Sequence, residues 1–191
     1  AVIKDFTLEN SYIKSTKNDG NTGSVGSIVG RLSGTLDTVK SSAHVILSGS
    51  EYAGGLVGDI NSAVGGTITN CWFDGDVSGS GGHHAQLLGG VREGATGYVT
   101  HCLATGKIEY QDNTGGRGGL VGTLWGQSTL YISDSLFAGT FYNVTENGTH
   151  GAVVGHANIE KGTVYVENEA IRIYDLMGGT GYGSIVTGAV N

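Results

Sequence analysis

The sequence predicts an all-β protein built as a parallel β-solenoid, in which about five to six coils of roughly 30 residues stack along one axis. Three observations lead to this fold class. The 191 residues include 36 glycines and no proline, and 38% are hydrophobic while only 14% are charged. A short glycine-containing motif recurs at nearly regular spacing, and apolar residues recur at fixed distances after it. We expect a single domain over residues 1–191, with partial coils at 1–25 and 183–191.

The composition excludes several other classes of protein. So many glycines would penalise long helices, collagen requires proline and strict glycine triplets, and the hydrophobic content is too high for a disordered chain. Seventeen acidic residues against ten basic ones give a net charge of -7, which argues against a nucleic-acid partner. No apolar run is long enough to span a membrane.

The recurring motif has the form small-small-aliphatic-aliphatic-Gly, and we interpret it as an anchor strand that opens each repeat. Its copies start 28 to 33 residues apart, which predicts loops of varying length between fixed strands. A weaker sixth copy occupies residues 183–187. The closing glycines of the other five copies are the predicted structural anchors: Gly30, Gly58, Gly89, Gly122 and Gly155.

A second pattern follows each anchor at fixed offsets. It reads Ile68, Cys71, Gly75, Val77 in one repeat, then Val99, Cys102, Gly106, Ile108, and then Ile132, Ser135, Gly139, Phe141. With small changes of loop length we extend it to Leu36, Val39, Ala43, Val45, to Val164, Glu167, Ile171, Ile173, and at the N-terminus to Ile3, Phe6, Asn10, Tyr12. We therefore expect three short strands per repeat, each paired with its counterpart about 4.8 Å away in the next coil, with aliphatic ladders pointing inward.

At these residues the sequence resembles the GLUG-motif repeat family, whose core is Gly-Leu-aliphatic-Gly. Residues 55–58 and 119–122 carry this core, and residues 66–71 are similar to the family's downstream pattern. Such repeats occur in bacterial surface proteins, in adhesins and in non-catalytic regions of IgA-cleaving metallopeptidases. The resemblance implies a right-handed β-solenoid at a cell surface, and it brings no catalytic residue to this chain. The copy at 85–89 departs from the pattern because it lacks a leading Gly-Gly.

The sequence predicts no enzyme activity, no cofactor and no metal site, since it contains no HExxH, G-x-S-x-G or P-loop motif. Segment 74–79 resembles the start of a calcium loop, but Ala85 replaces the required final carboxylate and Val77 already belongs to the repeat pattern. A polysaccharide-active solenoid enzyme is our third interpretation. Its candidate acids do not share one position of the repeat: Asp59, Asp74, Asp76, Glu93, Asp112 and Asp134.

Cys71 and Cys102 occupy the same position in adjacent repeats. Equivalent residues of neighbouring parallel strands lie within the Cα separation that a disulfide accepts, so a cross-coil disulfide is possible. We favour the alternative, a pair of free buried thiols that continues an inward ladder between Val39 and Ser135.

Histidines and aromatic residues offer further candidates. His83, His84 and His150 lie just before anchor motifs, and because two coils, roughly 10 Å, separate the last two, we interpret them as surface-turn residues and not as metal ligands. Several aromatic residues could form outward rows that stabilise the sheet or bind a ligand. They are Trp72, Trp125, Tyr110, Tyr131, Phe137, Tyr142 and Tyr165.

The low charge and the polar composition indicate an extracellular or cell-surface protein. Two sequons, beginning at Asn143 and Asn147, are possible glycosylation sites in a secreted protein. Neither end of the sequence shows a capping helix, so we expect exposed strand edges to associate with another copy or with neighbouring domains of a longer chain.

The predicted function is therefore non-enzymatic: an adhesin stalk or a self-assembling surface subunit that stacks through its solenoid edges. The alternative is a carbohydrate- or host-protein-binding domain of a larger bacterial surface protein. In either case the loops of variable length carry any specificity, because the strands are committed to the ladders. These loops are 78–84, 109–117 and 142–150.

Overall fold

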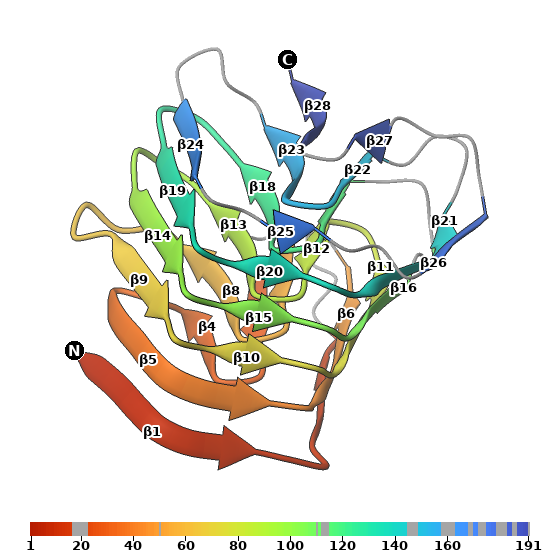
Figure 1. Cartoon of the computed structure of the whole chain (residues 1–191), viewed down its shortest axis with the longest axis horizontal. Coiled ribbons are helices and arrows are strands. Elements are labelled where there is room, and N and C mark those ends of the chain that lie inside the picture. Colours follow the sequence, from red (N-terminus) through yellow and green to blue (C-terminus); the bar gives the residue numbers. More distant parts are fainter. Residues whose placement is uncertain are drawn as a thin grey trace.

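The computed structural model of the chain is an all-β solenoid of parallel strands, as the sequence predicts (Figure 1). The structure describes residues 1–16, 23–49, 51–109, 111, 115–144, 149–157, 163–167, 170–171, 175–178, 183–184 and 187–190. Within these ranges every regular element is a strand, and no helix could span a membrane.

Four parallel sheets, named A to D in chain order, form the walls of the solenoid. Sheet A has ten strands and the other sheets have six each, so that successive passes of the chain add to every sheet. The strands of sheet A are β1 (Val2–Leu8), β5 (Gly34–Ser41), β9 (Gly66–Thr69), β10 (Trp72–Phe73), β14 (Thr96–Thr100), β15 (Leu103–Ala104), β19 (Thr129–Ser133), β20 (Leu136–Phe137), β24 (Thr163–Glu167) and β25 (Ala170–Ile171).

The remaining sheets follow the same order along the axis. Sheet B contains β2 (Tyr12–Ser15), β6 (His44–Ser48), β11 (Asp76–Ser80), β16 (Lys107–Glu109), β21 (Thr140–Val144) and β26 (Asp175–Gly178). Sheet C contains β3 (Gly23–Gly26), β7 (Glu51–Gly54), β12 (His83–Ala85), β17 (Gly116–Gly118), β22 (Thr149–Gly151) and β27 (Gly183–Ser184). Sheet D contains β4 (Val29–Arg31), β8 (Val57–Ile60), β13 (Leu88–Val91), β18 (Val121–Leu124), β23 (Val154–Ala157) and β28 (Thr187–Val190).

The prediction that the anchor motif forms one strand is wrong. The motif forms the corner between sheets C and D. Strand β7 ends at Gly54 and β8 begins at Val57, so the motif contributes to both sheets. Its closing glycine is needed because the two sheets approach closely: a Cβ added at Gly58 would lie 2.6 Å from the backbone N of Val25 in sheet C. The repeat therefore has four walls and not three strands, and glycine marks a close contact between two of them.

Sheet A bends once per coil at a residue in the left-handed conformation. These residues follow one another along the axis: Asp5 (φ 61°), Thr38 (φ 53°), Asn70 (φ 54°), His101 (φ 53°) and Asp134 (φ 51°). Asn, Asp and His tolerate this conformation better than most residues. The bend divides sheet A into two arms, which appear as separate strands from the third coil onward (Figure 1).

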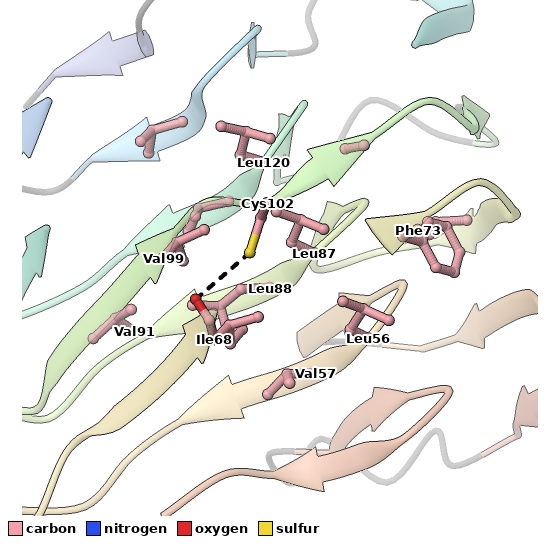
Figure 2. Packing of buried hydrophobic residues seen from close by; sticks show 14 of the residues in the cluster. Leu56, Val57, Ile68, Phe73, Leu87, Leu88, Val91, Val99, Cys102 and Leu120 are labelled. Carbon is pink, nitrogen blue, oxygen red and sulfur yellow. Dashed lines mark hydrogen bonds between the residues drawn. The ribbon is translucent and has the colours of Figure 1, made fainter. Parts of the chain in front are cut away.

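Inward aliphatic ladders form the core, as predicted. Leu36 pairs with Ile68, which pairs with Val99 and then Ile132, and each of these residues is almost fully buried. Figure 2 shows Ile68 and Val99 facing the side chain of Leu88, which comes from sheet D.

The predicted register fails at the two ends of the chain. At the N-terminal end Ile13, and not Tyr12, pairs with Val45, because one extra residue follows β1. In the last coil Val166, and not Val164, pairs with Ile132.

Two further assignments in the last coil are also wrong. Glu167 pairs with Ser133, so it does not occupy the cysteine position of the repeat. Ile171 pairs with Phe137 and not with Gly139, while Phe141 pairs with Leu176 and Ile173 lies outside the described residues.

Candidate functional site

The candidate acids do not converge on one site. Asp59 is completely buried, whereas Asp134 lies on the exposed bend of sheet A, 3.9 Å from the His101 ring nitrogen. Asp74 is 3.6 Å from the Lys40 ammonium, and Asp112 lies outside the described residues. In the part of the chain that the structure describes, no three of His, Cys, Asp and Glu form a potential metal site.

Asp59 is the centre of a buried ion-pair network in sheet D. Its carboxylate accepts hydrogen bonds from Nε of Arg31 at 3.0 Å and from Nε of Arg92 at 2.8 Å. The Arg92 side chain is itself only 4% exposed and also lies 3.5 Å from the exposed Glu93 carboxylate. Two guanidinium groups therefore neutralise the Asp59 carboxylate and tie three successive coils together, which is a structural role.

The interpretation of the histidines as surface-turn residues is wrong for two of them. His84 is fully buried and His150 is 7% exposed, and both point into the solenoid from sheet C. Between them in the same ladder lies Arg117, the largest fully buried side chain, which donates to the carbonyl oxygen of Gly82 at 2.7 Å. A column of three basic side chains thus crosses the interior.

The sequence contains a signal that could have placed this column. Each of its members stands immediately before an anchor motif, and the two earlier repeats carry Val25 and Ala53 at that position. Both of these residues are buried and pair in register with the column. The apolar residues Val25 and Ala53 indicate that this position of the repeat points inward. The same position in the later repeats, which holds polar side chains, therefore also points inward.

A second histidine group lies between sheets C and D. His83 stacks on Tyr52 at 5.6 Å on one side and on His156 at 5.7 Å on the other, measured between ring centroids. Its Nδ1 accepts a hydrogen bond of 2.9 Å from the backbone N–H of Gly116. Burial, together with the nearby His156 and Arg117, lowers the pKa of His83 to about 3, so the ring is neutral at physiological pH.

Burial is also the main cause of the lowered pKa values of His84 and His156. It lowers the pKa of His84 well below the usual value, with additional effects of Arg117 and His83. It lowers the pKa of His156 in the same direction. These histidines are therefore neutral and closely packed, and protonation of any of the rings would lower the free energy of unfolding of the protein.

The candidate aromatic residues differ in their surroundings: some stack on one another at the surface, and one is buried in the core. Tyr98, Tyr131 and Tyr165 stack along the outer face of sheet A with ring centroids 5.0 Å and 4.6 Å apart, so their faces are occupied by one another. Phe137, which we expected to be a candidate for an outward row, is fully buried. Trp125 is 45% exposed beside His156, and Tyr110 lies outside the described residues.

A groove of about 490 Å³ lies along the bend of sheet A in the first three coils. It is lined by Asp5, Phe6, Thr7, Thr38, Val39, Lys40, Asn70 and Trp72. Its volume falls in the range of small-molecule sites. Reasoning from the sequence did not find it, because the left-handed bend that brings the two arms together leaves no glycine in the pattern.

Cys71 and Cys102 are neighbours in the inward ladder, and both are buried free thiols. Their sulfur atoms donate to backbone carbonyls, Cys71 to Thr69 at 3.0 Å and Cys102 to Thr100 at 3.2 Å. The contact with Cys71 and burial raise the pKa of the Cys102 thiol well above its usual value. This environment suppresses thiolate chemistry at Cys102 in the folded state.

The N-terminal edge of the solenoid exposes apolar side chains that belong to the core ladders. Ile3 and Phe6 are 36% and 40% exposed, whereas their ladder partners Leu36 and Val39 are 0% and 1% exposed. On the described residues, β1 pairs only with β5, which leaves its other edge unpaired.

One of the two predicted glycosylation sites can be placed. Asn143 is exposed near the end of β21 and donates to the Glu109 carboxylate at 3.3 Å. Asn147 lies outside the described residues. The exposed position of Asn143 is compatible with a glycan, and its modification stays a prediction.

The comparison with known proteins identifies a fold neighbour but no family. No protein-family profile matches the sequence, and a search of curated proteins finds no relative. A solved structure described as a putative immunoglobulin A1 protease from Bacteroides ovatus matches with a TM-score of 0.68 and 21% sequence identity. The match covers 100% of this chain and 66% of that chain, so our chain spans just under two thirds of its length. The likeness shows the fold alone, and the GLUG resemblance stays a prediction from sequence.

Proposed function

We propose that this chain is a non-enzymatic β-solenoid module of an extracellular or cell-surface protein, which stacks end to end on another solenoid edge. The exposed ladder residues Ile3 and Phe6 are the observation that carries the proposal. Their neighbours in the ladders, Leu36 and Val39, are covered, so the surface that fits Ile3 and Phe6 best is one more coil in the same register.

The chemistry of the described residues supports a structural role. The buried Asp59 is neutralised by two arginines, and the buried histidines point into packed walls and not into a cleft. The fold neighbour carries a protease name, and we propose that our chain corresponds to a region without the catalytic centre, since the sequence has no HExxH motif.

The partner on the edge is a second copy or an adjoining solenoid domain of a longer chain. A second copy joined head to tail makes a contact that does not close on itself, which produces rods or filaments. We therefore expect molecular mass to rise with concentration, and elongated particles to be visible by electron microscopy.

The test compares two charge substitutions by light scattering at several concentrations. Phe6→Glu places a carboxylate on the exposed ladder and should abolish association, while Val64→Glu, on a turn where Val64 is 80% exposed, should leave it unchanged. A wild-type protein that stays monomeric at every concentration, or equal association of both variants, would overturn stacking on a second copy.

A further inference from the structure

We propose that the groove along the bend of sheet A is a binding site for a neutral, hydroxyl-rich ligand, namely a glycan. The groove lies along the side of the solenoid, although β1 contributes both to its lining and to the exposed edge. The polarity of the lining, the pairing of its two charged residues and the fixed position of its polar groups support a ligand of this kind.

The lining combines an apolar ring with hydrogen-bonding groups of several kinds. Trp72 is 37% exposed and contributes an indole, while Asn70, Thr38 and Asp5 contribute an amide, a hydroxyl and a carboxylate. A saccharide presents apolar C–H groups and many hydroxyl groups, which requires a site of this mixed kind.

The two charged residues of the lining, Asp5 and Lys40, are each paired with an opposite charge of the protein. The Asp5 carboxylate is 3.2 Å from the Lys4 ammonium, and the Lys40 ammonium is 3.6 Å from Asp74. Asp5 and Lys40 are thus not left as unpaired charges that would select a phosphate or a charged peptide, and the Asp37 carboxylate beside them is engaged by neutral donors. The pairing of both lining charges therefore favours an uncharged ligand.

Two of the polar groups are held in place by Asp37. Its carboxylate accepts hydrogen bonds of 2.9 Å from Nδ2 of Asn70 and of 2.9 Å from Oγ1 of Thr38. Because these donations fix the amide, its Oδ1 is presented as an acceptor in a defined direction. Asp37 stays ionised, since the same hydrogen bonds lower its pKa.

Trp72 is positioned in a similar way. Its Nε1 donates to Oγ1 of Thr105 at 3.0 Å, and the Lys40 ammonium lies 3.9 Å from the centre of its ring. The same position in the next two coils holds Leu103 and Leu136. The combination of indole and amide is thus confined to the coils that form the groove.

The solenoid offers a matched pair of substitutions. Asn70 and His101 both occupy the left-handed position of sheet A, one coil apart, and glycine adopts this conformation without strain. Asn70→Gly removes the amide from the groove, whereas His101→Gly makes the same backbone change outside its lining.

The experiment screens an array of neutral oligosaccharides with the wild-type protein, and then titrates the best soluble oligosaccharide by calorimetry. We expect Asn70→Gly and Trp72→Ala to weaken binding at least tenfold, and His101→Gly to change it less than twofold. Circular dichroism confirms that each variant is folded. Absence of binding to every neutral glycan, selection of acidic glycans or peptides only, or equal affinity of Asn70→Gly and His101→Gly would overturn the proposal.

Discussion

Replacing the anchor glycine Gly89 by alanine tests the claim that sheets C and D approach too closely for a side chain. An added Cβ would lie 2.8 Å from the backbone N and 2.9 Å from the backbone carbonyl carbon of Ala53, and would also meet the carbonyl oxygen of Gly58. Real Cβ atoms essentially never come this close to a heavy atom. Because every atom met is backbone, no side chain can rotate away, and the walls of two coils must move apart.

The magnitude follows from this geometry. Overpacking costs about 1–3 kcal/mol where side chains can shift, so a clash with backbone on two strands should cost about 3–4 kcal/mol. For a chain of this length that corresponds to a fall in the melting temperature of about 10 °C. Both quantities can be measured by urea and thermal unfolding, followed by circular dichroism.

Gly94→Ala is the matched control. Gly94 lies in a turn with φ +77°, and an added Cβ would meet nothing within 4 Å. The expected cost is only the conformational penalty of about 1–2 kcal/mol. If Gly94→Ala destabilised the protein as much as Gly89→Ala, the close approach of the sheets would not be the reason for the anchor glycine.

Three further predictions concern the buried polar groups. The free energy of unfolding should fall as the pH drops from about 6.5 towards 3, because only the unfolded state takes up protons on His83 and His84. The expected slope is up to about 1.4 kcal/mol per pH unit for each histidine. Chemical denaturation at several pH values measures this slope, and His84→Gln should reduce it. Asp59→Asn should lower the free energy of unfolding by about 3–5 kcal/mol, because Arg92 loses its buried counter-charge. Urea unfolding measures this difference, and a variant as stable as the wild type would contradict the prediction. Cys71 and Cys102 should resist alkylation in the folded protein and react in denaturant. Rapid alkylation of the native protein would show that the thiols are exposed. Absence of alkylation in denaturant without a reductant would show a disulfide.

The ladders could be predicted from the sequence because their residues repeat in identity and spacing. Ile68, Val99 and Ile132 are aliphatic at one offset from each anchor, and their pairing in the structure follows that offset. Inward positions in stacked coils share one environment, so the same residue types recur there. The prediction failed at Val164 and Tyr12, where loop lengths change and the offset no longer fixes the register.

The groove and the buried basic column could not be predicted in the same way. The bend of sheet A is occupied by different residues in each coil, and Thr38, Asn70 and His101 share a backbone conformation rather than a chemical type. Arg117, like His84 and His150, is polar at a position that the first two repeats fill with the apolar residues Val25 and Ala53. Patterns of residue type do not reveal a φ angle shared by different residues, and the inward position of the basic column is indicated only by the apolar residues of the first two repeats.

The groove and the stacking edge share one strand, and this has a thermodynamic consequence for the two proposed roles. Asp5, Phe6 and Thr7 of β1 line the groove, and Phe6 together with Ile3 is also exposed at the edge. A coil that stacks on β1 would extend sheet A and lengthen the groove beyond Asp5. A glycan that contacts both sides of the new junction would then favour stacking, and stacking would increase glycan affinity by the same factor. A glycan that fits within the first three coils would bind equally to free and stacked molecules, so the two cases differ in whether the ligand shifts the association equilibrium.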